Sequence, residues 1–281
     1  MSIKLTTLIE NNPSTTNPAL VCEHGLSVYI ETPDCTILFD TGQTGNFIKN
    51  ASLLGKDLAA VDCMLISHGH FDHSGGVHKL LEQGILGSHT KMIVGEEFFK
   101  PKFKRMEDNS YFFAGNSFSE KDIEAAGISI KKVDEDTIQL NDNMLIFHHF
   151  KVSNNFEHHN PLFVIEENGG HPLDQFQDEI ALGIKTEKGL VLLVGCSHVG
   201  IVNILNDVSK RVDMPIYMVI GGTHLVEANE ERVEKTIEAF KNLGIEKIAV
   251  SHCTGEHTIE KLKTSFGDGF VMNNTGNVIT I

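Results

Sequence analysis

Four potential metal ligands follow one short apolar segment, and this run constrains the fold more than any other part of the chain. Residues 61–66 read as a buried strand, residues 67–73 are SHGHFDH, and a glycine pair at 75–76 precedes a helical pattern. His68 and His70 can chelate one ion, while Asp72 and His73 can serve a second ion about 3.5–4 Å away. Imidazole and carboxylate ligands together suit zinc, iron or manganese. The run therefore predicts a two-metal site at a strand–helix junction.

Strand-like and helix-like segments alternate on both sides of this run. Strands are expected at 3–9, 26–31, 36–39, 180–185, 190–194, 216–220 and 247–250, and helices at 45–54, 75–82, 201–210, 230–243 and 258–265. Such alternation predicts an α/β architecture. Since no linker or internal repeat separates the two halves, a single domain over residues 1–281 is expected.

The stretch from about 96 to 143 differs from its surroundings because it lacks this clean alternation. It concentrates aromatic residues, namely Phe98, Phe99, Phe103, Tyr111, Phe112, Phe113 and Phe118. A short helix is expected to begin at Ser119, with Asp122 completing a capping pair, and to end at Gly127. We interpret the stretch either as a surface insertion with its own small core or as a lid or substrate-facing wall beside the active site.

Charge and cysteine content narrow the range of partners and compartments. The net charge is −15, from 38 acidic and 23 basic residues, and such a surface repels nucleic-acid phosphates and anionic lipids. A small anionic substrate stays compatible, because bound divalent metals reverse the sign locally. The five cysteines show no CxxC spacing, no segment approaches the roughly 18 apolar residues of a membrane span, and no signal-peptide pattern occurs. We expect a cytoplasmic protein with a small-molecule substrate; a homo-oligomer is left open.

The SHGHFDH run resembles the HxHxDH hallmark of the metallo-β-lactamase superfamily. Asp40-Thr41-Gly42, after the strand 36–39, resembles that superfamily's upstream motif, whose aspartate braces the metal loop. The resemblance covers nearly the whole chain in motif order, and the aromatic-rich stretch is its loosest part. It implies a four-layer αβ/βα sandwich, with two metal ions at one edge between the two sheets.

The later motifs depart from the superfamily's common pattern. Its usual Gly-Asp strand end is replaced here by Gly-Cys196-Ser-His198, so His198 is expected to be a ligand, while Cys196 is either a thiolate ligand or a small buried residue. His252 in the run SHCTG matches the superfamily's last histidine ligand. The usual histidine about twenty residues before the Gly-Asp strand is not evident. Asp178 and Glu179 lie close to that position, with Asp178 as a less certain ligand, and His158, His159 and His171 lie further upstream.

Two further motifs resemble one branch of the superfamily. These are EHGLS at 23–27 and GGTHL at 221–225, and together with GCSH, SHCTG and DEIAL they resemble the dihydropterin–ribofuranosylaminobenzene-phosphate synthases. The branch is associated with methanopterin synthesis. His24 and His224 are candidates for substrate contact or proton transfer, and the alternative for each is a hydrogen-bonded histidine behind the metal ligands.

The function expected from this pattern is a metal-dependent hydrolase acting on a phosphate or pyrophosphate ester. Two divalent ions, zinc before iron or manganese, would lower the pKa of a bound water to about 7 and so supply hydroxide. Asp72 would be both ligand and proton acceptor, and His224 or His24 would protonate the leaving group. The alternatives are a transferase that condenses a pterin pyrophosphate with an arylamine, and an iron-holding redox or sensor protein.

Overall fold

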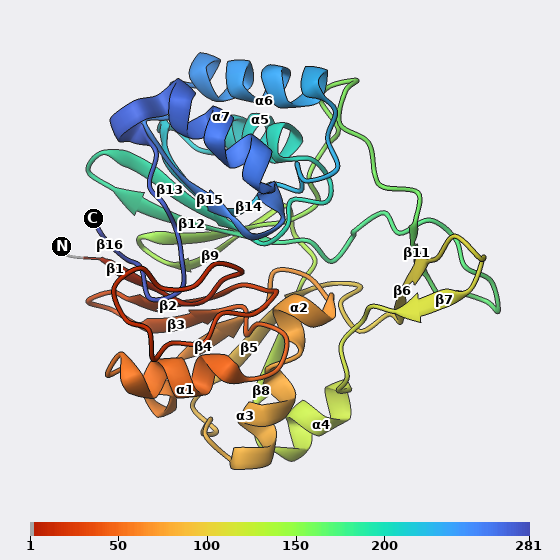
Figure 1. Cartoon of the computed structure of the whole chain (residues 1–281). Coiled ribbons are helices and arrows are strands. Elements are labelled where there is room, and N and C mark those ends of the chain that lie inside the picture. Colours follow the sequence, from red (N-terminus) through yellow and green to blue (C-terminus); the bar gives the residue numbers. More distant parts are fainter. Residues whose placement is uncertain (1–2) are drawn as a thin grey trace. The chain divides into compact units, whose positions relative to one another are not determined.

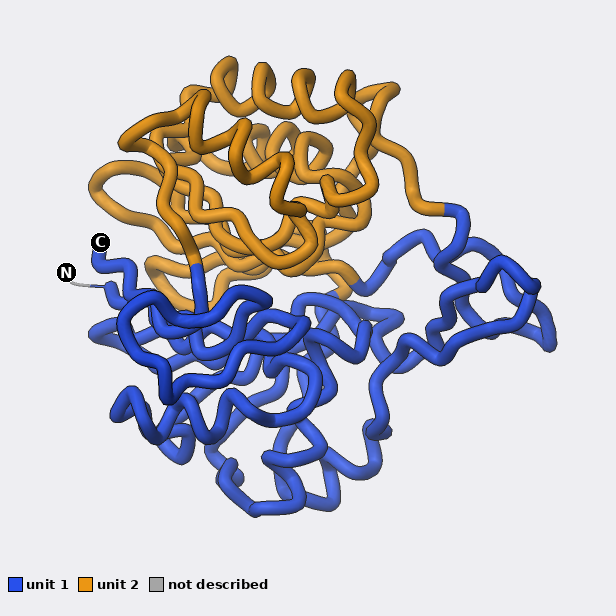
Figure 2. Tube along the Cα trace, in the orientation of Figure 1, with its two compact units in different colours: residues 1–133, 161–178, 274–281 blue, residues 134–160, 179–273 orange. Residues whose placement is uncertain are grey.

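The computed structural model describes residues 3–281 (Figure 1). The chain divides into two compact units (Figure 2). Unit 1 contains residues 1–133, 161–178 and 274–281, and unit 2 contains residues 134–160 and 179–273. None of the helices in the described part of the chain has the length and hydropathy needed to cross a membrane.

The main sheet of unit 1 has seven strands in the order β16-β1-β2-β3-β4-β5-β8. Their bounds are β1 Lys4–Ile9, β2 Ser27–Glu31, β3 Thr36–Phe39, β4 Cys63–Leu65, β5 Lys91–Gly95, β8 Ser129–Val133 and β16 Val278–Thr280. Strands β16, β1, β2 and β3 pair antiparallel, whereas β3, β4, β5 and β8 pair parallel. Because parallel neighbours need a crossover connection, this half of the sheet requires helices between its strands.

Helices supply those crossovers and cover one side of the seven-stranded sheet. They are α1 (Asn46–Leu53), the 3-10 helix η1 (Leu58–Ala60), α2 (Phe71–Ser74), α3 (Val77–Gln83) and α4 (Glu120–Ala125). Helices α1, α3 and α4 lie on the same side of the sheet (Figure 1). Phe47, Leu80 and Ile123, one from each helix, belong with Leu38 and Met64 of the sheet to one buried apolar cluster. Burial of this apolar face holds the helices against the strands.

The aromatic-rich stretch is divided among three sheets. Its strands β6 (Lys102–Arg105) and β7 (Tyr111–Phe113) form a separate three-stranded antiparallel sheet of unit 1 with β11 (Phe163–Ile165). Strand β8 belongs to the seven-stranded sheet, and helix α4 packs on that sheet. Strand β9 (Thr137–Asn141) belongs to the six-stranded sheet of unit 2. Phe98 and Phe118 are buried in the unit 1 core, but Phe112 is 52% exposed. The stretch is therefore part core and part surface.

Unit 2 is built on a six-stranded sheet in the order β15-β14-β13-β12-β10-β9. Its remaining elements are β10 Met144–Phe147, β12 Ala181–Thr186, β13 Gly189–Val194, α5 Ile201–Arg211, β14 Ile216–Gly222, α6 Glu230–Asn242, β15 Lys247–Ser251, η2 His252–Thr254, α7 Glu256–Phe266 and η3 Gly267–Gly269. Strands β13, β14 and β15 are parallel, so their carboxyl ends share one edge of the sheet. Helices α5, α6 and α7 lie on one side of this sheet (Figure 1).

Candidate metal centre

The four ligands of the SHGHFDH run gather at the carboxyl end of β4 in unit 1. His68 and His70 lie in the turn after the strand, and Asp72 and His73 lie in the first turn of helix α2. The His68 ring centroid is 4.8 Å from that of His70 and 4.4 Å from that of His73. Potential ligand atoms of His68 and His70 lie within 4.8 Å of each other, as do those of Asp72 and His73. All four side chains are buried.

Asp40, at the end of β3, braces this turn. Its Oδ1 accepts a hydrogen bond from the Ser67 backbone N–H (2.7 Å), and its Oδ2 accepts from the Ser67 hydroxyl (2.8 Å) and from His73 Nδ1 (2.7 Å). With Nδ1 of His73 turned to Asp40, Nε2 is the ring nitrogen on the side of Asp72, 3.8 Å from its Oδ2. A carboxylate behind a histidine is the usual way that proteins orient an imidazole for a metal.

Burial gives the histidines of this turn the protonation state that a metal requires. It lowers the pKa of His68 well below the ordinary value, and the neighbouring His73 and His70 lower it further. Burial, followed by the charge of Lys102, lowers the pKa of His70 to about 3. Both rings are therefore neutral at physiological pH, and neutral imidazole is the form that ligates.

A buried ion-pair group lies behind the turn. Asp178 Oδ2 accepts a hydrogen bond from the Gly69 backbone N–H (2.7 Å), and its Oδ1 lies 2.9 Å from Lys102 Nζ. Lys102 also pairs with Asp174 (2.8 Å). Both oxygens of Asp178 are thus engaged with protein donors, which favours a bracing position for this residue over direct ligation. Sequence reasoning missed Lys102, since nothing in a strand of aromatic and basic residues marks one lysine as buried.

His24 lies beside the same ligands. Its Nε2 is 3.2 Å from Asp72 Oδ2, and its side chain is 53% exposed. The segment that follows is fixed against Asp72, because Leu26 N–H donates to the Asp72 carbonyl (3.3 Å) and an added Cβ at Gly25 would lie 2.4 Å from that oxygen. Gly25 has φ of 141°, a conformation that residues with a side chain rarely adopt. His24 thus links a buried carboxylate to solvent.

Unit 2 presents a second set of ligand-type residues at the carboxyl ends of its parallel strands. His198 follows β13, His224 follows β14, and His252 follows β15. The rings of His198 and His224 have centroids 4.4 Å apart, and ligand atoms of Cys196 and His252 lie within 4.8 Å of each other. These three histidines come from distant segments, so the parallel arrangement of the strands is what assembles them.

Hydrogen bonds fix the strand-end loops of unit 2. The carboxylate of Glu179 accepts from the backbone N–H groups of His198 (2.8 Å) and Val199 (2.9 Å). The Cys253 thiol accepts from His224 N–H (3.3 Å) and donates to the Cys196 carbonyl (3.6 Å). Cys253, in the loop after β15, is therefore hydrogen-bonded to the loops after β13 and β14. Glu179 and Cys253 therefore hold in place the loops that carry the ligand-type residues of unit 2.

Three of the strand-end residues adopt a left-handed backbone conformation. The φ angles are 60° for Ser197, 46° for His224 and 56° for His252. Such conformations are costly for residues with a side chain and tend to occur at functional sites, where the surrounding structure enforces them. The turns after β13, β14 and β15 each have this feature, which supports a functional role for this edge of the sheet.

The other histidines considered as ligands lie in different surroundings. His171, in unit 1, stacks on Tyr111 of the three-stranded sheet with ring centroids 4.0 Å apart. His158 and His159 belong to the irregular segment of unit 2 before residue 160. None of the three belongs to the metal-ligand groups found among residues 3–281.

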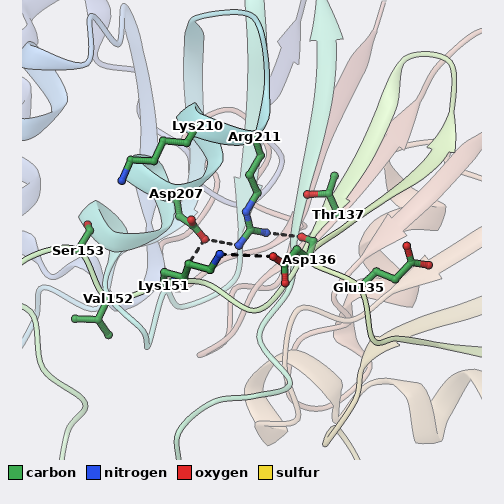
Figure 3. Close-up of a pocket in the computed structure, with 9 residues that line it drawn as sticks. All are labelled: Glu135, Asp136, Thr137, Lys151, Val152, Ser153, Asp207, Lys210 and Arg211. Atoms are coloured by element: carbon green, nitrogen blue, oxygen red, sulfur yellow. Dashed lines mark hydrogen bonds and ion pairs between the residues drawn. The ribbon is translucent and has the colours of Figure 1, made fainter.

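A separate polar pocket in unit 2 does not resemble a substrate site. It has a volume of about 820 Å³ and is lined by Glu135, Asp136, Thr137, Lys151, Val152, Ser153, Asp207, Lys210 and Arg211 (Figure 3). Arg211 donates to the Asp207 carboxylate and to the Asp136 and His148 carbonyls, and Lys151 lies 3.8 Å from Asp136. Because most of its cationic groups already have anionic or carbonyl partners, the pocket has little charge to offer an anionic ligand.

Comparison with known proteins places these motifs in a wider group. The model of the metallo-beta-lactamase superfamily matches residues 20–171. The chain is 32% identical, over 99% of its length and 96% of the relative, to the 7,8-dihydropterin-6-methyl-4-(β-D-ribofuranosyl)-aminobenzene-5′-phosphate synthase of Methanocaldococcus jannaschii. An uncharacterised protein of that organism is 28% identical, over 92% of this chain and 94% of the relative. The crystal structure of a metal-dependent hydrolase of the β-lactamase superfamily is 32% identical, with a TM-score of 0.82 and coverage of 99% of this chain and 98% of that one.

Proposed function

Because the chain belongs to the metallo-β-lactamase superfamily, we propose that it is a binuclear metal-dependent hydrolase that cleaves a phosphate or pyrophosphate ester. The α/β fold of metallo-β-lactamase type predicted from the sequence is confirmed by the superfamily match and by the TM-score of 0.82. The reaction and the number of metal ions are the proposed part.

The proposed ligands are those expected from the sequence. His68, His70, Asp72 and His73 belong to unit 1, and His198 and His252, with Cys196 as a further donor, belong to unit 2. The proposal therefore treats residues 1–281 as one functional domain. Imidazole nitrogens with a carboxylate and a thiol are a donor set that suits zinc, and iron or manganese are the alternatives.

The observation that carries the proposal is the arrangement of donor atoms at the end of β4. Ser67 Oγ lies 3.0 Å from His68 Nδ1 and donates a hydrogen bond to the Asp40 carboxylate. The same carboxylate accepts a hydrogen bond from His73 Nδ1. The Nδ1 atoms of these two histidines thus face a protein brace. A buried cluster of imidazoles that is oriented in this way fits a divalent cation better than it fits an apolar core, because buried polar groups without such a use are costly.

The residues around the ligands have separate tasks in this proposal. Two divalent ions would lower the pKa of water and neutralise charge that develops on phosphoryl oxygens. Asp72 would accept a proton, and His24, 3.2 Å away and open to solvent, would carry that proton out or deliver it to the leaving group. His224, next to His198, is the second candidate for protonating the leaving group.

Metal analysis and a substrate screen test the proposal together. Purified protein is expected to contain about two divalent ions per chain and to cleave bis(p-nitrophenyl) phosphate or an alkyl pyrophosphate, with activity lost on chelation and restored by zinc or manganese. The same metal analysis, with a visible spectrum, identifies iron. Metal-loaded protein that cleaves none of these esters would contradict the hydrolase proposal.

A transferase is the second candidate, and the sequence similarity to the synthase over nearly the whole chain favours it. In that reaction an arylamine would displace pyrophosphate from a pterin pyrophosphate, forming a C–N bond in place of the C–O bond. Incubation with both compounds distinguishes the two functions. Pyrophosphate release that depends on the amine and yields a coupled product indicates a transferase, whereas release without the amine indicates a hydrolase.

A further inference from the structure

Lys102 is a buried cation that none of the roles above uses. It lies on β6 of the three-stranded sheet, and only 1% of its surface is exposed. Lysine is almost never buried to this extent unless it is paired, because removal of an ammonium group from water is strongly unfavourable. Its Nζ lies 2.8 Å from Asp174 Oδ2 and 2.9 Å from Asp178 Oδ1. The two carboxylates provide that pairing.

Both carboxylates are connected to the turn that carries His68 and His70, one directly and the other through Phe176. Asp178 accepts from the Gly69 N–H (2.7 Å), between the two histidines. Asp174 accepts from the Phe176 N–H (2.7 Å), and the Phe176 ring packs edge-on against the His70 ring with centroids 5.7 Å apart. The hydrogen bond from Gly69 to Asp178 therefore fixes the backbone of the turn, and the contact of Phe176 with His70 fixes the plane of that imidazole.

The backbone of the turn lies in close contact with this group. An added Cβ at Gly69 would lie 2.7 Å from the Phe98 carbonyl oxygen and 3.0 Å from Lys102 Cε. The turn thus packs directly on the lysine stem. Burial opposes the charge on Lys102, but Asp178 and Asp174 together raise the pKa of its ammonium above the ordinary value, so the group stays ionised at neutral pH.

We propose that Lys102 is a positioning residue, which acts through Asp178 and Asp174 to fix the His68–His70 turn and thereby sets the metal affinity of the site. Lys102 does not contact substrate, since its side chain is only 2% exposed and its ammonium is held by the two carboxylates. The inference rests on the proposed function only in assuming that the His68–His70 turn binds a metal ion. It requires a metal site but no particular reaction.

The test uses the full-length protein and titration with Co²⁺, whose visible spectrum reports the geometry of the ligands. Lys102→Met keeps the length of the stem and removes the charge. We expect the first Co²⁺ to bind about 10–100-fold more weakly, the size of effect seen when residues behind metal ligands are changed, and the absorption bands to shift. Lys102→Arg restores the charge and is expected to recover part of the affinity. Lys131→Met, at an exposed position of β8, is the matched control and should match the wild type.

Circular dichroism of each variant separates positioning from folding. A folded Lys102→Met protein with the wild-type Co²⁺ affinity and spectrum would overturn the inference. If Lys102→Met does not fold, Asp174→Asn decides the matter, because Asp174 pairs with Lys102 and is not a candidate ligand: weaker Co²⁺ binding supports the inference, and unchanged binding overturns it. Failure of both variants to fold would assign the group to folding and would also overturn it. A wild-type protein that binds Co²⁺ but cleaves no ester defeats the proposed function alone.

Discussion

Replacement of Asp40 by asparagine should weaken metal binding without moving the backbone. Asp40 is fully buried and has φ of 58°, a conformation that asparagine tolerates about as well as aspartate and that alanine does not. The carboxylate accepts three hydrogen bonds, two from Ser67 and one from His73 Nδ1. The amide has one oxygen and cannot accept all three. We therefore expect its NH₂ group to face His73.

The expected magnitude follows from the histidine tautomer. An amide N–H donates to His73 Nδ1 only when the ring carries its proton on Nε2, and that tautomer cannot ligate a metal through Nε2. Restoring the ligating tautomer would bring two buried donors together and leave one unsatisfied. That costs about 1–3 kcal/mol, which corresponds to a roughly fivefold to 150-fold loss of affinity.

The assay is competition for Zn²⁺ between metal-free protein and a chromophoric chelator, for the wild type and Asp40→Asn. Asp34→Asn removes the same charge from the exposed turn between β2 and β3, and it is expected to bind zinc as the wild type does. Urea unfolding of the metal-free proteins shows whether both variants remain folded. If folded Asp40→Asn binds zinc as tightly as the wild type, the argument that Asp40 selects the ligating tautomer of His73 is wrong.

Four further substitutions, one of them with a matched control, separate the metal site from its scaffold. His70→Ala and His252→Ala should each lower the metal content and abolish activity while the far-ultraviolet circular dichroism stays unchanged; full metal stoichiometry in both variants would count against the ligand assignment. Gly69→Ala should weaken zinc binding in the same competition assay, because its methyl group would lie 2.7 Å from a backbone carbonyl oxygen, whereas Gly170→Ala, with only one atom within 4 Å, should have no effect. Glu157→Gln should lower the free energy of unfolding in urea by about 1–3 kcal/mol, because the Glu157 carboxylate accepts two backbone N–H groups in the first turn of α5; an equal loss of metal affinity would contradict a purely structural role.

The sequence alone determined the parts of the site that are local in the chain. His68, His70, Asp72 and His73 lie within six positions, so a strand followed by a short helix brings them together whatever the rest of the fold does. The α/β class was equally accessible, since the alternation of apolar strands and amphipathic helices repeats along both halves. Periodicity and ligand spacing report such short-range relations directly.

The tertiary structure decided the parts that depend on distant pairing. Lys102 lies 72 and 76 residues from the two aspartates that allow its burial. No periodic pattern marks such a group, and composition alone predicts an exposed lysine. Strand pairing likewise divided the aromatic-rich stretch among three sheets. The sequence did not predict this division, because the same aromatic residue types occur both in a core and on a surface. Opposite charges that compensate each other's desolvation can come from any two segments, so only the folded chain reveals which segments meet.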